Sequence, residues 1–147
     1  MKKAMKLFAV LFTALFVLLG CAKEETATFE LKREGLVSTL VYYYKGDVVT
    51  KQTAKSEIDL KKLPISEEEA LKKFQENTDL YNSVKGVTAT QEVKDGIVTQ
   101  FVTVDYTVAK LSDLKKAIPS DFSGPGDKVS FKASKEGLIK IGYTEKK

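Results

Sequence analysis

The chain has 147 residues, 24 of them basic and 20 acidic, and a formal net charge of +4. It contains no histidine, no tryptophan, one cysteine and a single arginine, Arg33. Because arginine supplies the planar fork that grips phosphates, its near absence argues against a nucleic-acid partner. Without histidine or a second cysteine, any catalysis would depend on carboxylates, lysine, tyrosine, serine or threonine.

The first twenty residues are typical of a secretory signal peptide. Lys2, Lys3 and Lys6 precede a stretch, 7–20, that is apolar apart from Thr13. Its 14 residues fall short of the ~18 to 20 that a membrane-spanning helix needs, so a transmembrane anchor is the weaker alternative.

The only cysteine, Cys21, directly follows this stretch. The sequence Leu18-Leu19-Gly20-Cys21 resembles a bacterial lipobox, in which a diacylglycerol is attached to the cysteine thiol and the preceding peptide bond is cut. Gly20 is the small residue that this cut requires. The chain offers no second cysteine for a disulfide and no histidine to activate the thiol. We therefore expect cleavage after Gly20, a membrane partner through a lipid on Cys21, and an extracytoplasmic location.

Cleavage of 20 of the 147 residues would leave 127, which suit one domain with a modest core. It would also remove three lysines and leave 21 basic against 20 acidic residues. Most of the net positive charge therefore belongs to the signal segment. Residues 21–27 are short and mainly polar and are expected to form a lipidated tether. A single domain is expected over residues 28–147.

Three strands are predicted before the first long helix. Thr28–Lys32 leads to a turn at Glu34-Gly35, and Val37–Tyr44 is rich in β-branched and aromatic residues. Both alternating faces of Val37–Tyr44 carry apolar side chains, which predicts a central strand covered on both sides. After a turn at Lys45-Gly46-Asp47, Val48–Ile58 is expected to return with one face in water.

The segment from Ser66 to about Val84 is predicted to be an amphipathic helix. Ser66 and Glu69 have the spacing of a capping box. Acidic residues crowd its first turn, where they offset the helix dipole; a metal site is the alternative interpretation. The stripe expected to pack on the sheet recurs at helical spacing and comprises Leu71, Phe74, Thr78 and Tyr81.

A second hairpin is predicted over residues 87–108. Val87–Val93 has the composition of a strand, and Asp95-Gly96 is the strongest hairpin-turn signal in the chain. Ile97–Val108 alternates between a valine-rich face and a face that carries threonines, Phe101 and Asp105.

Two further helices are expected in the C-terminal part, over Ser112–Ile118 and over Phe131–Ile141 with Gly142 as its end. Because Gly137 weakens the second helix, a strand over Leu138–Tyr143 is the alternative. Together the elements predict an α+β fold, an antiparallel sheet of about five strands built from hairpins, with helices packed on one face.

Several segments resemble those of the YehR-like bacterial lipoproteins, a family whose function is not established. The resemblance includes the lipobox, YYYKGDVVTKQTA at Tyr42–Ala54, Gly86-Val87 and TVDYTV at Thr103–Val108. It covers essentially the whole mature chain, although the segment after residue 119 matches loosely. The resemblance implies a lipid-anchored α+β domain outside the cytoplasmic membrane, and it implies no reaction and no catalytic residues.

Seven residues form the candidate binding surface. Tyrosine offers apolar area with a polar tip, and Lys51 and Thr53 lie on the predicted partner strand. Asp105 would need a partner, such as Lys51 or a tyrosine hydroxyl, if it were buried. Packing of two of the three consecutive tyrosines in the core, and a solvated polar face, are the alternatives. The candidates are Tyr42, Tyr44, Lys45, Lys51, Thr53, Asp105 and Tyr106.

Three functions remain open from the sequence. A non-catalytic binding module for an envelope protein, a peptide or a cell-wall fragment is favoured by the anchor and the small size. A one-lobed carrier of a small apolar ligand would require a large cavity between helices and sheet. An envelope hydrolase would have to draw its carboxylate pair from Asp47, Glu57, Asp59 and Asp105. No cofactor and no metal are predicted, and the pattern does not indicate an oligomeric state.

The lipid on Cys21 can be tested directly. Radiolabelled palmitate is expected to enter the wild-type protein in growing cells and to be absent from Cys21→Ser, which lacks the thiol to be alkylated. Gel autoradiography of the immunoprecipitated proteins measures the difference. Equal labelling of both proteins would show that Cys21 is not the attachment site.

Overall fold

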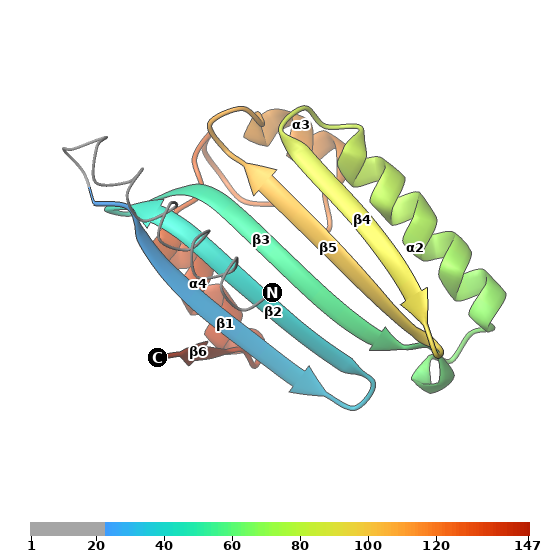
Figure 1. The fold of residues 1–147 in the computed structure, drawn as a ribbon. Coiled ribbons are helices and arrows are strands. Elements are labelled where there is room, and N and C mark those ends of the chain that lie inside the picture. The colour runs from blue at the N-terminus through green and yellow to red at the C-terminus, as the bar shows by residue number, and fades with distance from the viewer. Residues whose placement is uncertain (1–22) are drawn as a thin grey trace, which may run out of the picture.

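The computed structural model describes residues 23–147 (Figure 1). The expected signal peptide 1–20, with its cleavage site at Gly20, and the expected lipid-attachment residue Cys21 lie outside the described residues. No helix within residues 23–147 is long and apolar enough to cross a bilayer.

An antiparallel sheet of six strands forms the body of the protein, in the order β4-β5-β3-β2-β1-β6. The fold class is the predicted α+β. The strands are β1 (Glu25–Arg33), β2 (Leu36–Lys45), β3 (Val48–Asp59), β4 (Val87–Lys94), β5 (Ile97–Asp105) and β6 (Thr144–Lys146).

The sheet differs from the sequence-based expectations mainly at two strand ends and by one additional strand. Residues 25–27, expected in the tether, belong to β1 because they pair with the end of β2. The strand expected over Ile97–Val108 ends at Asp105, whose backbone carbonyl accepts hydrogen bonds from the following loop. The sixth strand, β6, has only three residues and pairs with Thr28–Glu30 of β1.

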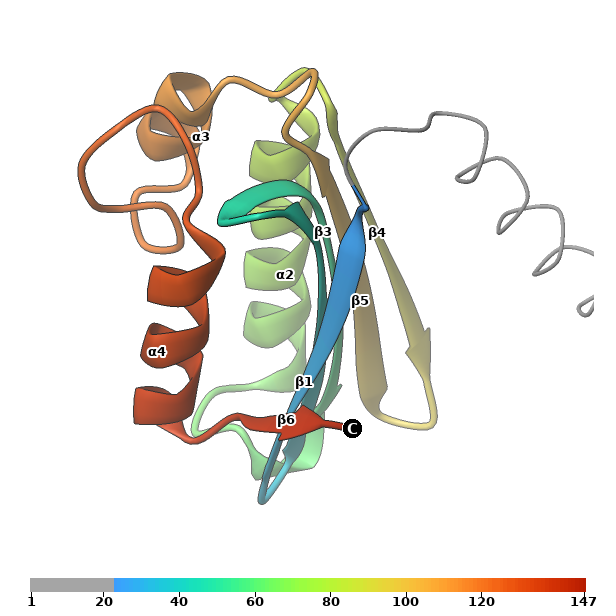
Figure 2. The same cartoon turned by 90° about the vertical axis from the view of Figure 1, so that its left-hand side faces the viewer.

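All three α-helices lie on the same face of the sheet (Figure 2). The predicted helix at residue 66 ends at Asn82, and residues 131–141 form a helix, so the alternative strand over 138–143 is wrong. The prediction that both faces of Val37–Tyr44 are covered is also wrong, because no described helix lies on the second face. The helices are η1 (Leu60–Lys62), α2 (Glu67–Asn82), α3 (Leu111–Ala117) and α4 (Phe131–Ile141).

Capping residues bound the two longer helices, at Ser66 and Gly142 as the sequence predicts and also at Ser130. The backbone N–H of Glu69 donates to Ser66 Oγ at 3.2 Å, at the start of α2. Ser130 Oγ accepts from the N–H of Ala133 at the start of α4, and Gly142 ends that helix with a φ of 107°. These local signals set the ends of the helices independently of their packing against the sheet.

The turn between β2 and β3 is tied to α4. Asp47 accepts hydrogen bonds from the backbone N–H of Lys132 and from the hydroxyl of Ser130, both at 2.7 Å. These two bonds, the backbone bond first, hold the pKa of the Asp47 carboxyl below its usual value. The side chain of this turn residue therefore positions the N-terminus of α4 over β1 and β2.

The core between α4 and the sheet is aromatic. Phe29, buried completely, meets the Tyr42 ring edge to face with ring centroids 5.9 Å apart. Phe131 of α4 packs against both, and it stacks on Tyr44 with parallel rings 3.6 Å apart. Two of the three consecutive tyrosines thus face the helices, as expected for core packing.

A second core lies between α2, α3 and the β4–β5 hairpin. Leu114 and Val98 are completely buried, and of the predicted α2 stripe Thr78 and Tyr81 are buried while Leu71 and Phe74 are half-buried. The other members of this apolar layer are Leu60, Ala70, Val84, Val87, Ala89, Val102, Val104, Ala109 and Ile118.

Gly86 is predicted to be irreplaceable in this layer. Its φ is +88°, and a Cβ built there would lie 2.5 Å from the backbone nitrogen of Ala109. Gly46, with a φ of +59° and open space around it, provides the matched control. We expect Gly46→Ala to cost about 1 kcal/mol and Gly86→Ala about 2 kcal/mol more, measured by urea unfolding. Equal losses for the two variants would contradict the close approach.

Tyr42 is predicted to make stability fall at high pH. Burial raises the pKa of its phenol from 10.0 to about 12. Because an unfolded chain loses this proton near pH ~10, the stabilisation is complete below that pH and is lost as the pH approaches 12. Tyr42→Phe should flatten the fall of unfolding free energy by up to ~1.4 kcal/mol per pH unit in this window. Burial also raises the pKa values of Tyr81 and Tyr106, so the variant should still lose some stability as the pH rises. An unchanged slope in the variant would contradict this assignment.

Candidate functional site

Within residues 23–147, one face of the sheet carries no helix, and we call it the open face (Figure 2). Side chains alternate between the two faces of a strand, so the residues between the buried positions point to this side. The open face consists of Thr26, Thr28 and Glu30 on β1; Val37, Thr39, Val41 and Tyr43 on β2; Lys51, Thr53, Lys55 and Glu57 on β3; Thr99, Phe101, Thr103 and Asp105 on β5; and Thr88, Thr90 and Glu92 on β4.

The row nearest the start of β1 combines an acid, a cation and an aromatic ring. Lys51 pairs in register with Asp105 on one side and with Tyr43 on the other. Its ammonium lies 5.0 Å from the centroid of the Tyr43 ring. Asp105 instead accepts hydrogen bonds from the N–H and the hydroxyl of Thr107, at 2.9 and 2.5 Å. Asp105 therefore has a local partner in the turn after β5.

Hydroxyl groups dominate the middle of the open face. The registers align Thr88, Thr103 and Thr53 with Val41 and Thr28 in one row across five strands. In the next row Phe101 is 39% exposed, and the Lys55 ammonium lies 5.8 Å from its ring centroid. The face thus offers aromatic area surrounded by groups that can both donate and accept hydrogen bonds.

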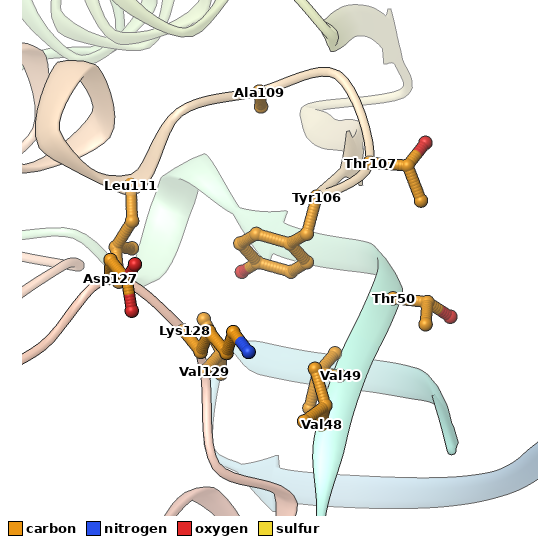
Figure 3. Close-up of a pocket in the computed structure, with 10 residues that line it drawn as sticks. All are labelled: Val48, Val49, Thr50, Tyr106, Thr107, Ala109, Leu111, Asp127, Lys128 and Val129. Atoms are coloured by element: carbon orange, nitrogen blue, oxygen red, sulfur yellow. The ribbon is translucent and has the colours of Figure 1, made fainter.

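The covered face carries a cavity of about 260 Å³ beside Tyr106 (Figure 3). The Tyr106 ring projects from the loop after β5, toward Lys128 and Val129 of the segment before α4. Its hydroxyl donates to Gln52 Oε1 at 2.8 Å, and burial raises its pKa well above the usual value. The lining is completed by Val48, Val49, Thr50, Thr107, Ala109, Leu111 and Asp127.

The seven predicted site residues do not form one surface. Lys51, Thr53 and Asp105 lie together on the open face. Tyr42 and Tyr44 pack against α4 on the covered face, and Tyr106 lines the cavity there. Lys45 is exposed at the end of β2, before the turn to β3.

Two aromatic residues of the open face were not among the candidates. Tyr43 lies between Tyr42 and Tyr44 in the same strand. Because successive side chains of a strand point to opposite faces, Tyr43 must point away from the face of its two neighbours. Phe101 alternates with the buried Val102, so the same pattern placed it beside Thr103 and Asp105. Neither pattern alone indicates which face lacks a cover.

The four acids considered for hydrolysis each have a separate structural partner. Asp47 caps α4, and Asp59 accepts from the N–H of Lys61 at 3.0 Å. Glu57 forms an ion pair with Lys55 at 3.0 Å, and Asp105 bonds Thr107. Within residues 23–147, no group of three or more Cys, Asp, Glu or His side chains is placed to hold a metal ion.

The chain is similar in sequence to two bacterial lipoproteins and in fold to one solved structure. The chain is 34% identical to the uncharacterized lipoprotein Lin0239 of Listeria innocua over 147 residues, 99% of this chain and 96% of the relative. It is 30% identical to the uncharacterized lipoprotein YehR of Escherichia coli over 109 residues, 71% of each chain. The NMR structure of YehR superimposes with a TM-score of 0.69 at 22% identity, covering 84% of this chain and 91% of that one, which shows the shared fold.

These matches confirm the resemblance to the YehR-like lipoproteins that the sequence segments indicate. A family model described as "Protein of unknown function (DUF1307)" matches residues 25–144, the whole of the sheet except the end of β6. The chain therefore belongs to the DUF1307 family, whose relatives here are uncharacterized lipoproteins.

Proposed function

We propose that the protein is a lipid-anchored, non-catalytic binding module that presents the open face of its sheet to another protein of the cell envelope. The lipoprotein names of its relatives and the Leu18–Cys21 pattern support the anchor on Cys21 and the extracytoplasmic location. The observation that carries the binding role is the uncovered face, with Tyr43 and Phe101 among threonines. Such rigid aromatic area costs little conformational entropy when it is covered by a partner.

The charges on the open face favour a neutral partner surface. Lys55 pairs with Glu57, and Glu30 pairs with both Lys32 and Lys146, at 2.8 to 3.0 Å. The two lysines that pair with Glu30 hold the pKa of its carboxyl below the usual value, and the hydrogen bond from Lys146 is the larger cause. Because these charges largely compensate one another, long-range attraction of a strongly charged polymer is weak. Recognition then depends on the aromatic rings and the threonine hydroxyls.

The edges of the sheet are less suited to binding than the open face. The Asn82 side chain makes two hydrogen bonds of 2.8 Å with the backbone of Ala89. These bonds occupy part of the outer edge of β4. At the other side, β6 pairs with Thr28–Glu30 in the middle of β1. An added strand would therefore find both edges partly occupied.

A carrier of a small apolar ligand is the second candidate, and the cavity beside Tyr106 is the observation that favours it. Its 260 Å³ are below the ~300 to 1,000 Å³ of common ligand pockets, and a more open hollow of about 560 Å³ adjoins it around Tyr106, Ala109 and Leu111. A carboxylate-dependent hydrolase receives less support, because a general acid needs a raised pKa whereas that of Asp47 is lowered.

Photo-crosslinking in living cells tests the binding module. Photo-reactive residues placed at Tyr43 and at Phe101 of the full chain should capture the same envelope protein. Leu80 on α2 and Ile139 on α4, 47% and 49% exposed on the covered side, serve as matched positions and should not capture it. Adducts are identified by mass spectrometry after immunoprecipitation.

The contrary outcomes are distinct. An envelope protein captured from Leu80 or Ile139 but not from Tyr43 and Phe101 would move the binding surface to the helices. Absence of any protein adduct at the four positions would contradict the binding module and favour the carrier, which a ligand screen on the purified full chain would then examine.

A further inference from the structure

The anchored end of the chain meets the domain at the rim of the cavity. Glu24 Oε1 accepts a hydrogen bond of 2.5 Å from the hydroxyl of Thr50, and Thr50 lines the cavity. Cys21 precedes Glu24 by three residues, which span at most ~11 Å even when fully extended. A lipid on Cys21 would therefore hold this rim close to the headgroups of the bilayer.

Two exposed apolar side chains project at the same rim. Val48 lines the cavity and is 39% exposed, and Val108 lies in the loop after β5 and is 46% exposed. The loop of Val108 also supplies Thr107 and Ala109 to the cavity. Exposed valines at the anchored end are positioned to enter the interfacial layer of a membrane.

Lysines surround these valines. Lys45 ends β2 and pairs with Val48, Lys110 follows the loop of Val108, and Lys128 lines the cavity. None of the three forms an ion pair with a residue that the structure describes.

The acids at this rim are mostly engaged within the domain. Asp47 is bound by α4, Asp105 by Thr107 and Glu24 by Thr50. Asp127, which lines the cavity, and the exposed Glu25, which pairs in register with Tyr44, are the exceptions and reduce the local positive charge. The carboxylates keep their negative charge when they accept these bonds, but in the described part of the chain none forms an ion pair with the three lysines, whose ammonium groups are therefore free to meet phosphate groups.

We propose that this rim, with Val48, Val108 and the three lysines, docks on the anionic phospholipid surface to which the protein is anchored. The proposal rests on the lipid anchor at Cys21. Docking at this end fixes the orientation of the domain, with the β1–β2 and β4–β5 turns at the far ends of strands about 30 Å long. The open face then stands roughly upright on the membrane, accessible to a partner from the side.

Depth-dependent fluorescence quenching tests the docking. The acylated full chain is placed in phosphatidylethanolamine–phosphatidylglycerol vesicles, and an environment-sensitive dye is attached to Val48→Cys or Val108→Cys. Ile97→Cys and Val93→Cys, 43% and 47% exposed near the far β4–β5 turn, are the matched controls. Lipids with brominated acyl chains should quench the dye at least about twofold more at the two rim positions than at the controls.

A charge variant separates docking from anchoring. Lys45→Glu, Lys110→Glu and Lys128→Glu together should abolish the excess quenching at the rim, while the protein still sediments with the vesicles. Equal quenching at rim and control positions in vesicle-bound, acylated protein would overturn the docking alone. A chain without a lipid on Cys21 by mass spectrometry, which fails to sediment, would overturn both the anchor and the docking that rests on it.

Discussion

Burial of a single face of the sheet is the constraint on which the rest of the structure depends. Phe29, Val98 and Val104 leave water only if helices cover the side to which they point. The helices α2 and α4 both lie there, one over the β4–β5 hairpin and the other over β1 and β2 (Figure 2). The opposite side needs no cover for folding, because threonines and paired charges occupy most of it.

The hydrogen bonds of a few polar residues make this arrangement specific. Asp47 links the β2–β3 turn to the start of α4, and Asn82 links the end of α2 to the outer edge of β4. Between α2 and the sheet, Gln100 donates to Asn77 and to Thr78 at 3.1 Å. Both α2 and α4 are thus held in position by polar contacts as well as by apolar packing, so the covered face has little freedom to rearrange around a large ligand.

Local signals predicted the elements well, because they depend on residues close in the chain. Asp95-Gly96 forms the expected turn with positive φ at both residues, and Ser66 and Gly142 fix helix ends. The cover of β2 was not predictable from its own sequence, since Val41 and Tyr42 are both apolar and only packing decides which is buried. The three-residue β6 depends on β1 for its pairing and carries too few residues for a pattern of its own.

The location of the candidate site residues also depends on long-range pairing, which the pattern of a single strand does not contain. Alternation along β3 puts Lys51 and Thr53 on one face, but only the register with β5 places Asp105 beside them, and neither pattern shows that Tyr106 lines a cavity on the other face. A register shift between Tyr43 and Tyr44 adds to the difficulty, because Tyr44 pairs with Val49 while Tyr43 pairs with Lys51. Long-range pairing of this kind is invisible within a single strand.

The central claim is that the open face is occupied by a partner in the cell. Thiol accessibility measures this most directly, using Thr53→Cys and Thr103→Cys of the full chain, with Leu80→Cys on α2 as the reference position. The ratio of maleimide labelling rates, in cells against purified protein in vesicles, should be well below one at the two threonine positions and near one at Leu80. A ratio near one at all three positions would show that the open face is empty in the cell and would contradict the account.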